Sequence, residues 1–312
     1  MSRLIFSSRI FALACLLVSI AACATPQIPA DATPKTSLRV LAVETFLADI
    51  AQNVAGTRVH VDALISVGVD PHDFEPTPAD VRKVADSQVL IVNGAGLEEF
   101  LAKLLANAGG KRIVIEAAAG LKSRTPTTNE ILDPDHPGDP HFWLDPNNVI
   151  KYVENIRDGL SQADPAGAAA YQANAEAYSA QLKVLDTWIA EQVKPIPPAR
   201  RLLVTNHESF GYFADRYGFR IVGTIVPSVS PDASSSAQQL AVLVNQIKAA
   251  KAPAIFLETG TNPQLARQIA QETGVQVVTE LYTHSTTNAQ GPAPTYIGMM
   301  EYNVQTIVSA LK

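Results

Sequence analysis

Short apolar runs alternate with segments of helical periodicity along most of the chain after residue 37. In the first half, each run with strand character is followed by a segment in which apolar residues recur every three or four positions. This pattern predicts strands at 38–43, 59–65, 89–93 and 112–116, and helices at 46–54, 78–85 and 97–107. Alternating strands and helices are typical of a parallel sheet with helices on its faces.

The second half of the chain repeats the alternation. Predicted strands at 201–205, 220–225, 254–257 and 276–281 are followed by predicted helices at 210–217, 237–250, 263–273 and 295–311. Two further helices are predicted between the halves, at 147–160 and 166–193, and the second ends before a proline-rich stretch that cannot continue a helix. The pattern therefore predicts an α/β fold of two halves with parallel sheets, connected by a long and rigid helix.

The N-terminal segment has the features of a lipoprotein signal peptide. Arg3 and Arg9 supply positive charge, and residues 10–22 form an apolar run that is too short to span a bilayer comfortably. The small residues before Cys23 resemble a lipobox, so we expect this cysteine to carry lipid and to become the mature N-terminus. Ordinary cleavage after Ala22 is the alternative, but it would leave a free thiol in an oxidising compartment.

The chain is thus predicted to have five parts. A signal peptide (1–22) and a flexible tether rich in Ala, Thr and Pro (23–37) precede an N-terminal lobe (38–165), a linking helix (166–194) and a C-terminal lobe (195–312). The sequence after residue 22 contains one cysteine, which excludes a disulfide scaffold. The net charge of −6 becomes −8 when the two arginines of the signal peptide are removed, which argues against nucleic acid as a partner.

Four of the six histidines follow predicted strands. Neutral imidazole is the commonest protein ligand for borderline transition metals, and ligands of open α/β sheets bind beyond the carboxyl ends of the strands. Two of these histidines come from each half, so all four meet in one cleft if the two sheets face each other at those ends. The candidate metal ligands are His72, His141, His207 and His284.

The individual histidines leave alternatives open. His207 alone could satisfy a loop, and the Thr and Ser neighbours of His284 would suit any exposed loop. His60 lies inside a predicted strand, which favours a surface or packing role. His136 lies in a loop with several acidic residues, where solvation is the expected state and weak ion capture a minor alternative.

Four neutral ligands would leave the full charge of a metal ion inside the cleft. Carboxylates that bind the other ring nitrogen would offset this charge and fix the ring tautomers. The candidates for this role are Glu75, Asp145, Glu208 and Glu258. Helix capping and pairing with the helix dipole are equally good explanations for Asp145 and Glu208.

The motifs around the four histidines resemble those of a known family, the lipidated metal-binding receptors of zinc and manganese ABC transporters, or cluster A-I solute-binding proteins. The resemblance rests on residues 71–78, 141–146, 207–212, 281–285 and 295–303, and it runs from about residue 38 to the C-terminus. It implies two (β/α)₄ lobes joined by a long helix, with the ion between them. The third ligand of the family is His or Glu, here His207, and the fourth is usually Asp or Glu, whereas this chain has His284.

A set of four nitrogen ligands favours Zn²⁺ over Mn²⁺, because imidazole suits zinc and because zinc lies above manganese in the order of stability of divalent complexes. The expected function is capture of a divalent transition metal outside the cytoplasm for delivery to an ABC permease, and zinc is the expected metal. The expected protein is a lipid-anchored monomer of the cell envelope, on its periplasmic or extracellular face, and not an enzyme.

Two other classes of function remain open from the sequence. One is a zinc hydrolase in which three histidines hold the ion, Glu208 acts as the general base and His284 stands away from the metal. The other is a metal-binding surface adhesin with the same fold.

Overall fold

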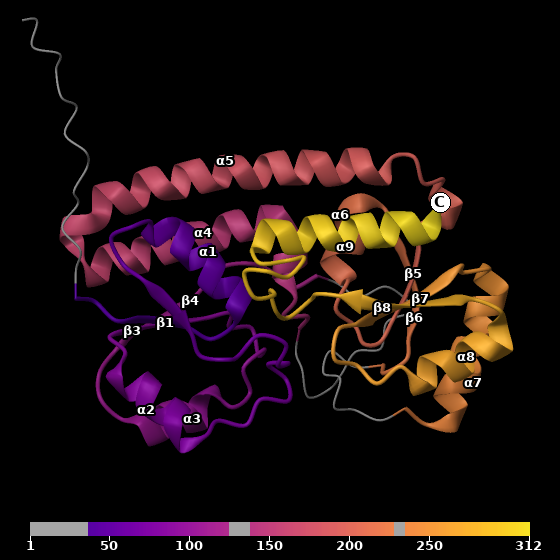
Figure 1. Cartoon of the computed structure of the whole chain (residues 1–312), viewed down its shortest axis with the longest axis horizontal. Coiled ribbons are helices and arrows are strands. Elements are labelled where there is room, and N and C mark those ends of the chain that lie inside the picture. Colours follow the sequence, from indigo (N-terminus) through magenta and orange to yellow (C-terminus); the bar gives the residue numbers. More distant parts are fainter. Residues whose placement is uncertain (1–36, 125–137, 228–234) are drawn as a thin grey trace, which may run out of the picture. The chain divides into compact units, whose positions relative to one another are not determined.

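Two four-stranded parallel sheets form the framework of the protein (Figure 1), seen in a computed structural model that describes residues 37–124, 138–227 and 235–312. The first sheet has the order β2-β1-β3-β4 and the second the order β6-β5-β7-β8, so the two halves share one topology. The predicted fold class is confirmed. The strands are β1 (Val40–Ala42), β2 (Val61–Ala63), β3 (Val89–Val92), β4 (Ile113–Glu116), β5 (Leu202–Thr205), β6 (Arg220–Thr224), β7 (Ala254–Glu258) and β8 (Gln276–Leu281).

The helices follow the predicted pattern closely. The one large difference is α3, which begins at Leu101 and not at residue 97. The residues before it form turns, in which the Glu98 carboxylate accepts hydrogen bonds from the backbone N–H groups of Asn93 and Gly94. The α-helices are α1 (Thr45–Ala55), α2 (Pro78–Asp86), α3 (Leu101–Ala108), α4 (Pro146–Ala163), α5 (Ala168–Val193), α6 (Gly211–Tyr217), α7 (Ala237–Ala250), α8 (Gln264–Thr273) and α9 (Tyr296–Leu311), and a 3₁₀ turn, η1, covers Phe142–Leu144.

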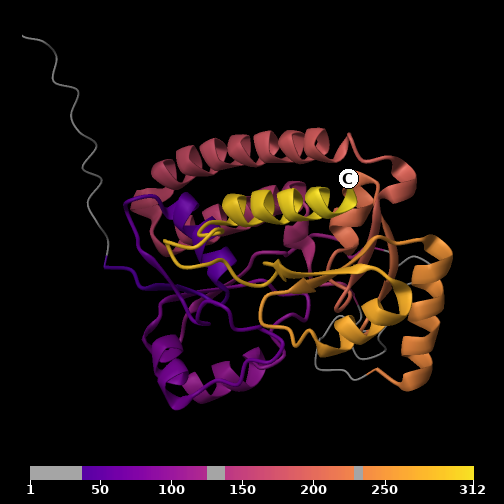
Figure 2. The ribbon, with the colours of Figure 1, turned by 45° about the vertical axis from the view of Figure 1, so that its right-hand side comes forward.

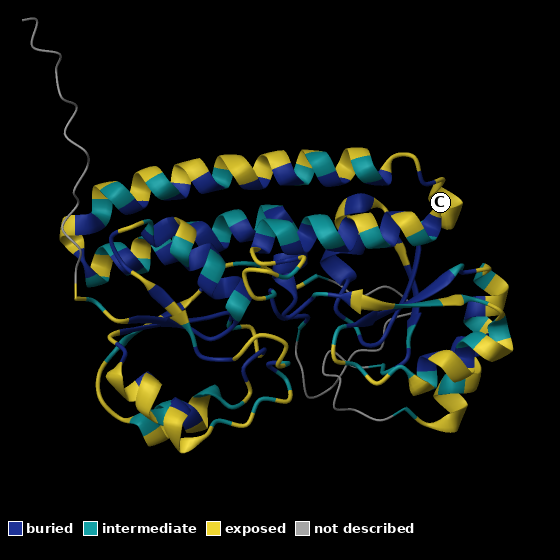
Figure 3. Cartoon of the chain, in the orientation of Figure 1, coloured by how far each residue is buried: buried dark blue, intermediate teal, exposed yellow. Residues whose placement is uncertain are grey.

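The central strands β1, β3, β5 and β7 are short, fully buried runs because both faces of each sheet are covered there. In β1, Val40 and Ala42 pack on one side, whereas Leu41 packs on the other against α2 and α3. The second sheet is divided in the same way, with α7 and α8 covering one face. The core on the remaining faces is continuous from the first sheet to the second, through α1, α4, α5 and α9. Figure 3 shows this buried layer between the sheets and the long helix.

Helix α5 is the long connector that the sequence predicts. Its 26 residues correspond to about 39 Å at 1.5 Å per residue. It packs against α1 and α4 of the first half and against α6 and α9 of the second, and Figure 2 shows it running alongside α4 and α9. Its buried residues are those of the predicted apolar stripe: Tyr171, Ala175, Tyr178, Leu182, Leu185, Ile189 and Val193.

The described residues all belong to one compact unit of the chain. None of the helices in these residues combines the length and the hydropathy needed to cross a bilayer. The predicted signal peptide, Cys23, the tether up to residue 36 and His136 lie outside the described residues.

Candidate metal site

The four candidate histidines come together beyond the carboxyl ends of the strands. His72 lies in the loop between β2 and α2, His141 lies directly before η1, His207 follows β5, and His284 follows β8. One ring nitrogen from each histidine lies within 4.8 Å of a ring nitrogen of every other. His141 and His207 are fully buried, His284 is 6% exposed and His72 is half-buried.

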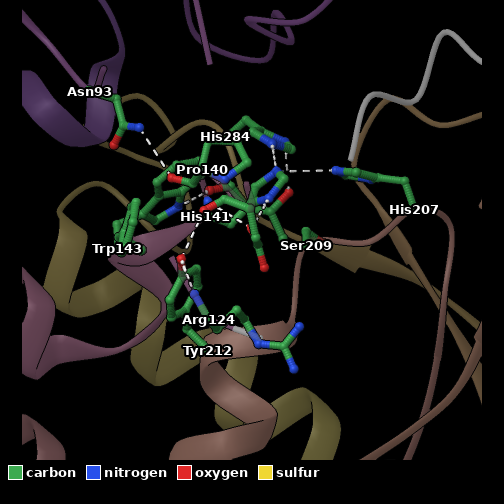
Figure 4. Close-up of polar contacts among 12 residues, drawn as sticks. Asn93, Arg124, Pro140, His141, Trp143, His207, Ser209, Tyr212 and His284 are labelled. Carbon is green, nitrogen blue, oxygen red and sulfur yellow. Dashed lines mark hydrogen bonds and ion pairs between the residues drawn. The ribbon is translucent and has the colours of Figure 1, made fainter. Parts of the chain in front are cut away.

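The spacing of the ring nitrogens fits a single small cation. The Nε2 atom of His141 lies 3.1 Å from Nε2 of His284 and 3.4 Å from Nε2 of His207. In a tetrahedral zinc site with bonds of about 2.0–2.1 Å, the ligand nitrogens are roughly 3.3 Å apart. Figure 4 shows these three side chains with their nitrogens directed toward one another. The ring of His72 completes the group, with its centroid 5.1–5.9 Å from the other three.

The first two histidines are held by the same local motif, Asp-Pro-His. In each case the aspartate two residues earlier accepts a hydrogen bond of 2.9 Å from the backbone N–H of the histidine, Asp70 at His72 and Asp139 at His141. Proline between the two fixes the backbone of the turn. Asp139 was not among the predicted carboxylates, although the repeated tripeptide was a signal in the sequence that could have found it.

Asp139 also fixes the tautomer of His141. Its Oδ1 atom lies 2.8 Å from Nδ1 of the ring. Because an ionised carboxylate can only accept, Nδ1 must donate, and the lone pair of the ring then lies on Nε2, the atom at the centre of the group.

Glu258, at the end of β7, orients two imidazoles at once. Its Oε1 lies 3.1 Å from Nδ1 of His207, and its Oε2 lies 3.1 Å from Nδ1 of His284. Ser209 donates a further hydrogen bond of 3.0 Å to Oε1, and Glu258 is only 5% exposed. When both rings are neutral, each donates from Nδ1 to Glu258 and directs its Nε2 lone pair toward the centre, as a tetrahedral ion requires.

The other predicted carboxylates have different surroundings. Glu75 is exposed, and Glu208 is half-buried beside His207. Asp145 caps α4, because its side chain accepts from the backbone N–H of Asn147 at 2.9 Å; helix capping is thus the correct interpretation for this residue. Asp70, which the sequence did not single out, lies 3.7 Å from Nδ1 of His284.

Burial and nearby charges set the protonation of the group. Burial lowers the pKa of His141, and the imidazoles of His284 and His207 lower it further, well below its usual value. Burial also lowers the pKa of His284, but the carboxylates of Asp70 and Glu258 outweigh this effect and raise it to about 9. Burial raises the pKa of Glu258, but the adjacent imidazoles hold it well below its usual range. At neutral pH without metal, His284 is therefore an imidazolium beside an ionised Glu258.

Aromatic residues close one side of the group. The ring of Trp143 is fully buried, with its centroid 5.2 Å from that of His141 and 5.6 Å from that of His284. Phe46 stacks on its other face at 4.5 Å. A cavity of about 310 Å³ adjoins another side of the four histidines. Of these histidines, only His284 lines it. The other lining residues include Gly68, Val69, Asp70, Asp73 and Glu258. Three carboxylates, those of Asp70, Asp73 and Glu258, line this cavity, and their charge attracts cations.

Replacing Glu258 with glutamine should lower zinc affinity by about 10–100-fold, the range typical of groups that orient metal ligands. The amide offers one acceptor, so at least one ring loses the partner that keeps its Nε2 free of a proton. Competition with a chromophoric chelator measures the change. The matched control is Glu280→Gln, which alters an exposed carboxylate bonded to Tyr302 and should leave affinity unchanged. Equal affinity of both variants would contradict the role given to Glu258.

Comparison with known proteins places this chain among metal-binding proteins of bacterial envelopes. The family model of ZnuA, described as zinc-uptake complex component A periplasmic, matches residues 40–310. The manganese-binding lipoprotein MntA of Halalkalibacterium halodurans is 37% identical over 275 residues, which cover 88% of each protein. The iron-binding protein YfeA of Yersinia pestis is 33% identical over 293 residues, which cover 93% of this chain and 91% of that protein.

Solved structures of periplasmic metal-binding proteins are also similar to this chain. The Mn-bound periplasmic metal binding protein from Candidatus Liberibacter asiaticus is 29% identical, with a TM-score of 0.78, over 88% of this chain and 100% of that one. The periplasmic zinc binding protein TroA from Treponema pallidum is 28% identical, with a TM-score of 0.79, over 88% of this chain and 99% of that one. The relatives thus share the architecture, while their names cite manganese, iron or zinc.

Proposed function

Because this chain belongs to the ZnuA family of periplasmic zinc-uptake components, we propose that it captures zinc outside the cytoplasm and delivers it to an ABC permease. Its role as a substrate-binding component of a metal ABC transporter follows from the family and from relatives such as the metal ABC transporter substrate-binding lipoprotein SloC of Streptococcus mutans. The family consists of transporter components, and this chain is not an enzyme.

The proposal assigns His72, His141, His207 and His284 as the ligands of the ion. Its main support is the convergence of one ring nitrogen from each histidine to within 4.8 Å of the others. The carboxylates that orient three of these rings give further support. A hydrolase would need His284 to stand apart and leave a position for water, whereas its Nε2 lies 3.1 Å from that of His141. This distance favours the receptor over the hydrolase, in agreement with the family, whose members are transporter components.

Zinc is the proposed cargo because all four candidate ligands are imidazole nitrogens. Manganese favours carboxylate oxygen and lies far below zinc in the order of complex stability. Carboxylates do surround the group, but Asp139 and Glu258 face the Nδ1 atoms, on the side of each ring away from the centre. Relatives are named for manganese and for iron as well as zinc, so the choice of metal rests on the donor atoms of this chain.

The proposed location follows from the N-terminal sequence and the relatives. Several relatives are named lipoproteins, and Cys23 follows small residues at the end of an apolar run. We propose a lipid anchor at Cys23, a tether that keeps the metal-binding body beside the membrane, and a monomeric protein. The continuous core and α5 join the two halves, which favours release by movement of loops over wide separation of the halves.

Zinc should be the metal present when the protein is isolated from its native cell envelope, and elemental analysis of that material tests the proposal. In vitro, the purified protein should bind Zn²⁺ more tightly than Mn²⁺ in chelator competition. The variant His284→Asp, which introduces an oxygen ligand, should narrow the ratio of the two affinities. Manganese in the native material, or equal affinities for both ions in the unmodified protein, would contradict zinc as cargo while leaving a metal-transport role intact.

A further inference from the structure

The loop that carries His284 belongs by sequence to the second half of the chain, but its polar contacts reach the first half. The Thr283 carbonyl accepts a hydrogen bond of 2.7 Å from Nε1 of Trp143. The Ser285 hydroxyl accepts one of 2.8 Å from the backbone N–H of Gly68, in the loop that leads to His72. Residues 283–286 are all at least nine-tenths buried, whereas Gly68 is exposed.

Thr45, the first residue of α1, is at the centre of this attachment. Its hydroxyl oxygen accepts a hydrogen bond of 2.9 Å from the backbone N–H of Thr286 and lies 3.2 Å from the hydroxyl oxygen of Ser285. One turn later in α1, Asp49 accepts a bond of 2.9 Å from the backbone N–H of Tyr296. Helix α1 of the first half therefore bonds to this part of the chain at Thr286 and at the start of α9, whereas Tyr282, directly after β8, is bonded to Asn303 of α9.

The contacts that hold His207, in contrast, come from the second half of the chain. The His207 carbonyl accepts a hydrogen bond of 2.8 Å from the hydroxyl of Thr205. The carboxylate of Glu258, in β7, lies 3.1 Å from its Nδ1. These groups come from β5 and β7, so His207 is held by the second half.

We propose that Thr45 is a positioning residue for His284: its hydroxyl attaches the His284 loop to the first half of the protein. This inference rests on the proposed function. His72 and His141 are then held by the first half and His207 by the second, whereas His284 is held by both: Glu258 of β7 orients its ring, and α1 holds its loop. Thr45 does not contact the ion and acts only through the loop.

Thr45→Val tests the inference, since valine keeps the shape of threonine and removes the hydroxyl. Zinc release, followed by capture with a chelator in excess, should become about tenfold faster, as expected for the loss of one buried hydrogen bond. Thr45→Ser, which keeps the hydroxyl, should release zinc at the unmodified rate. The matched control is Thr273→Val, which removes the hydroxyl of another half-buried threonine, bonded at 2.7 Å to Ile269 in α8; it should leave release unchanged.

A second set of measurements separates positioning from general destabilisation. The Thr45→Val effect should persist when His207 is replaced by asparagine and vanish when His284 is replaced by asparagine. In the metal-free protein, hydrogen exchange at the Thr286 amide should be faster in Thr45→Val, whereas exchange in β5 should not change.

The possible failures are distinguishable. If the unmodified protein binds no zinc, the proposed function fails. If it binds zinc but Thr45→Val releases the ion at the unmodified rate, with unchanged exchange at Thr286, the positioning role is overturned and the function stands. An effect of Thr45→Val that survives in the His284→Asn background would also overturn the role, because the hydroxyl would then act through another ligand.

Discussion

Replacing His141 with alanine should lower zinc affinity at least about a thousandfold, beyond the 10–100-fold typical of groups that only orient a ligand. His141 lies close to two of the other ligands. Its Nε2 atom is 3.1 Å from Nε2 of His284 and 3.4 Å from Nε2 of His207. Alanine would remove one of four ligands and open a cavity in a fully buried position. Three imidazoles would then share the ion with water, and the closed site would become an open one.

Zinc titration in competition with a strong chelator measures this loss. His60→Ala is the control, because His60 is an exposed histidine paired only with Asp62, which is also exposed, and its removal should leave affinity unchanged. The unfolding temperature of both metal-free variants shows whether the fold is intact. A folded His141→Ala protein that keeps the affinity of the unmodified chain would remove His141 from the site and with it the proposed ligand set.

The fold could be predicted because parallel strands covered on both faces consist almost wholly of apolar residues. β3 is the clearest case, since Val89 to Val92 are all fully buried. The start of α3 was predicted four residues too early, because Leu97, Leu101 and Leu104 keep a helical spacing across residues that form turns. The length of α5 was visible in its apolar stripe, and the proline-rich stretch after residue 194 marked its end.

The candidate residues of the site could be selected from the sequence, but the distances between their side chains could not. The rule that ligands gather at the carboxyl ends of strands selected the four histidines, and the need to offset the charge of the ion led to Glu258 among four candidate carboxylates. The distances between rings, and the bridging of two imidazoles by one carboxylate, depend on how the loops pack. Asp145 illustrates the limit, because Asp before Pro at a helix start satisfies the capping rule as well as a metal-related role.

The attachment of the His284 loop to the first half was beyond sequence reasoning altogether. His284 follows a strand of the second sheet, so its position in the chain assigns it to that half. Its loop is nevertheless held by Trp143, Thr45 and Gly68, which are distant in sequence. Such contacts between a loop and a remote helix terminus carry no periodic signal, because single hydroxyl and carbonyl groups make them.

Zinc affinity should rise steeply with pH between pH 7 and 9, by about tenfold per unit, because binding must displace one proton. The carboxylates of Asp70 and Glu258 outweigh burial and raise the pKa of His284 to about 9, so the metal-free ring is protonated below that pH. A histidine must be neutral to bind zinc, so affinity falls as the pH drops below 9. Burial holds the pKa of His141 well below its usual value, and this ring contributes no proton in the same interval.

Chelator competition at several pH values gives the slope, and calorimetry in buffers of different ionisation enthalpy counts the protons released. We expect about one proton per zinc at pH 7.5. His284→Asn is the informative variant: it should bind more weakly, and the slope between pH 7 and 9 should largely disappear. A pH-independent affinity of the unmodified protein across this interval would show that His284 is neutral before the metal arrives, and that Glu258 and Asp70 do not hold it as an imidazolium.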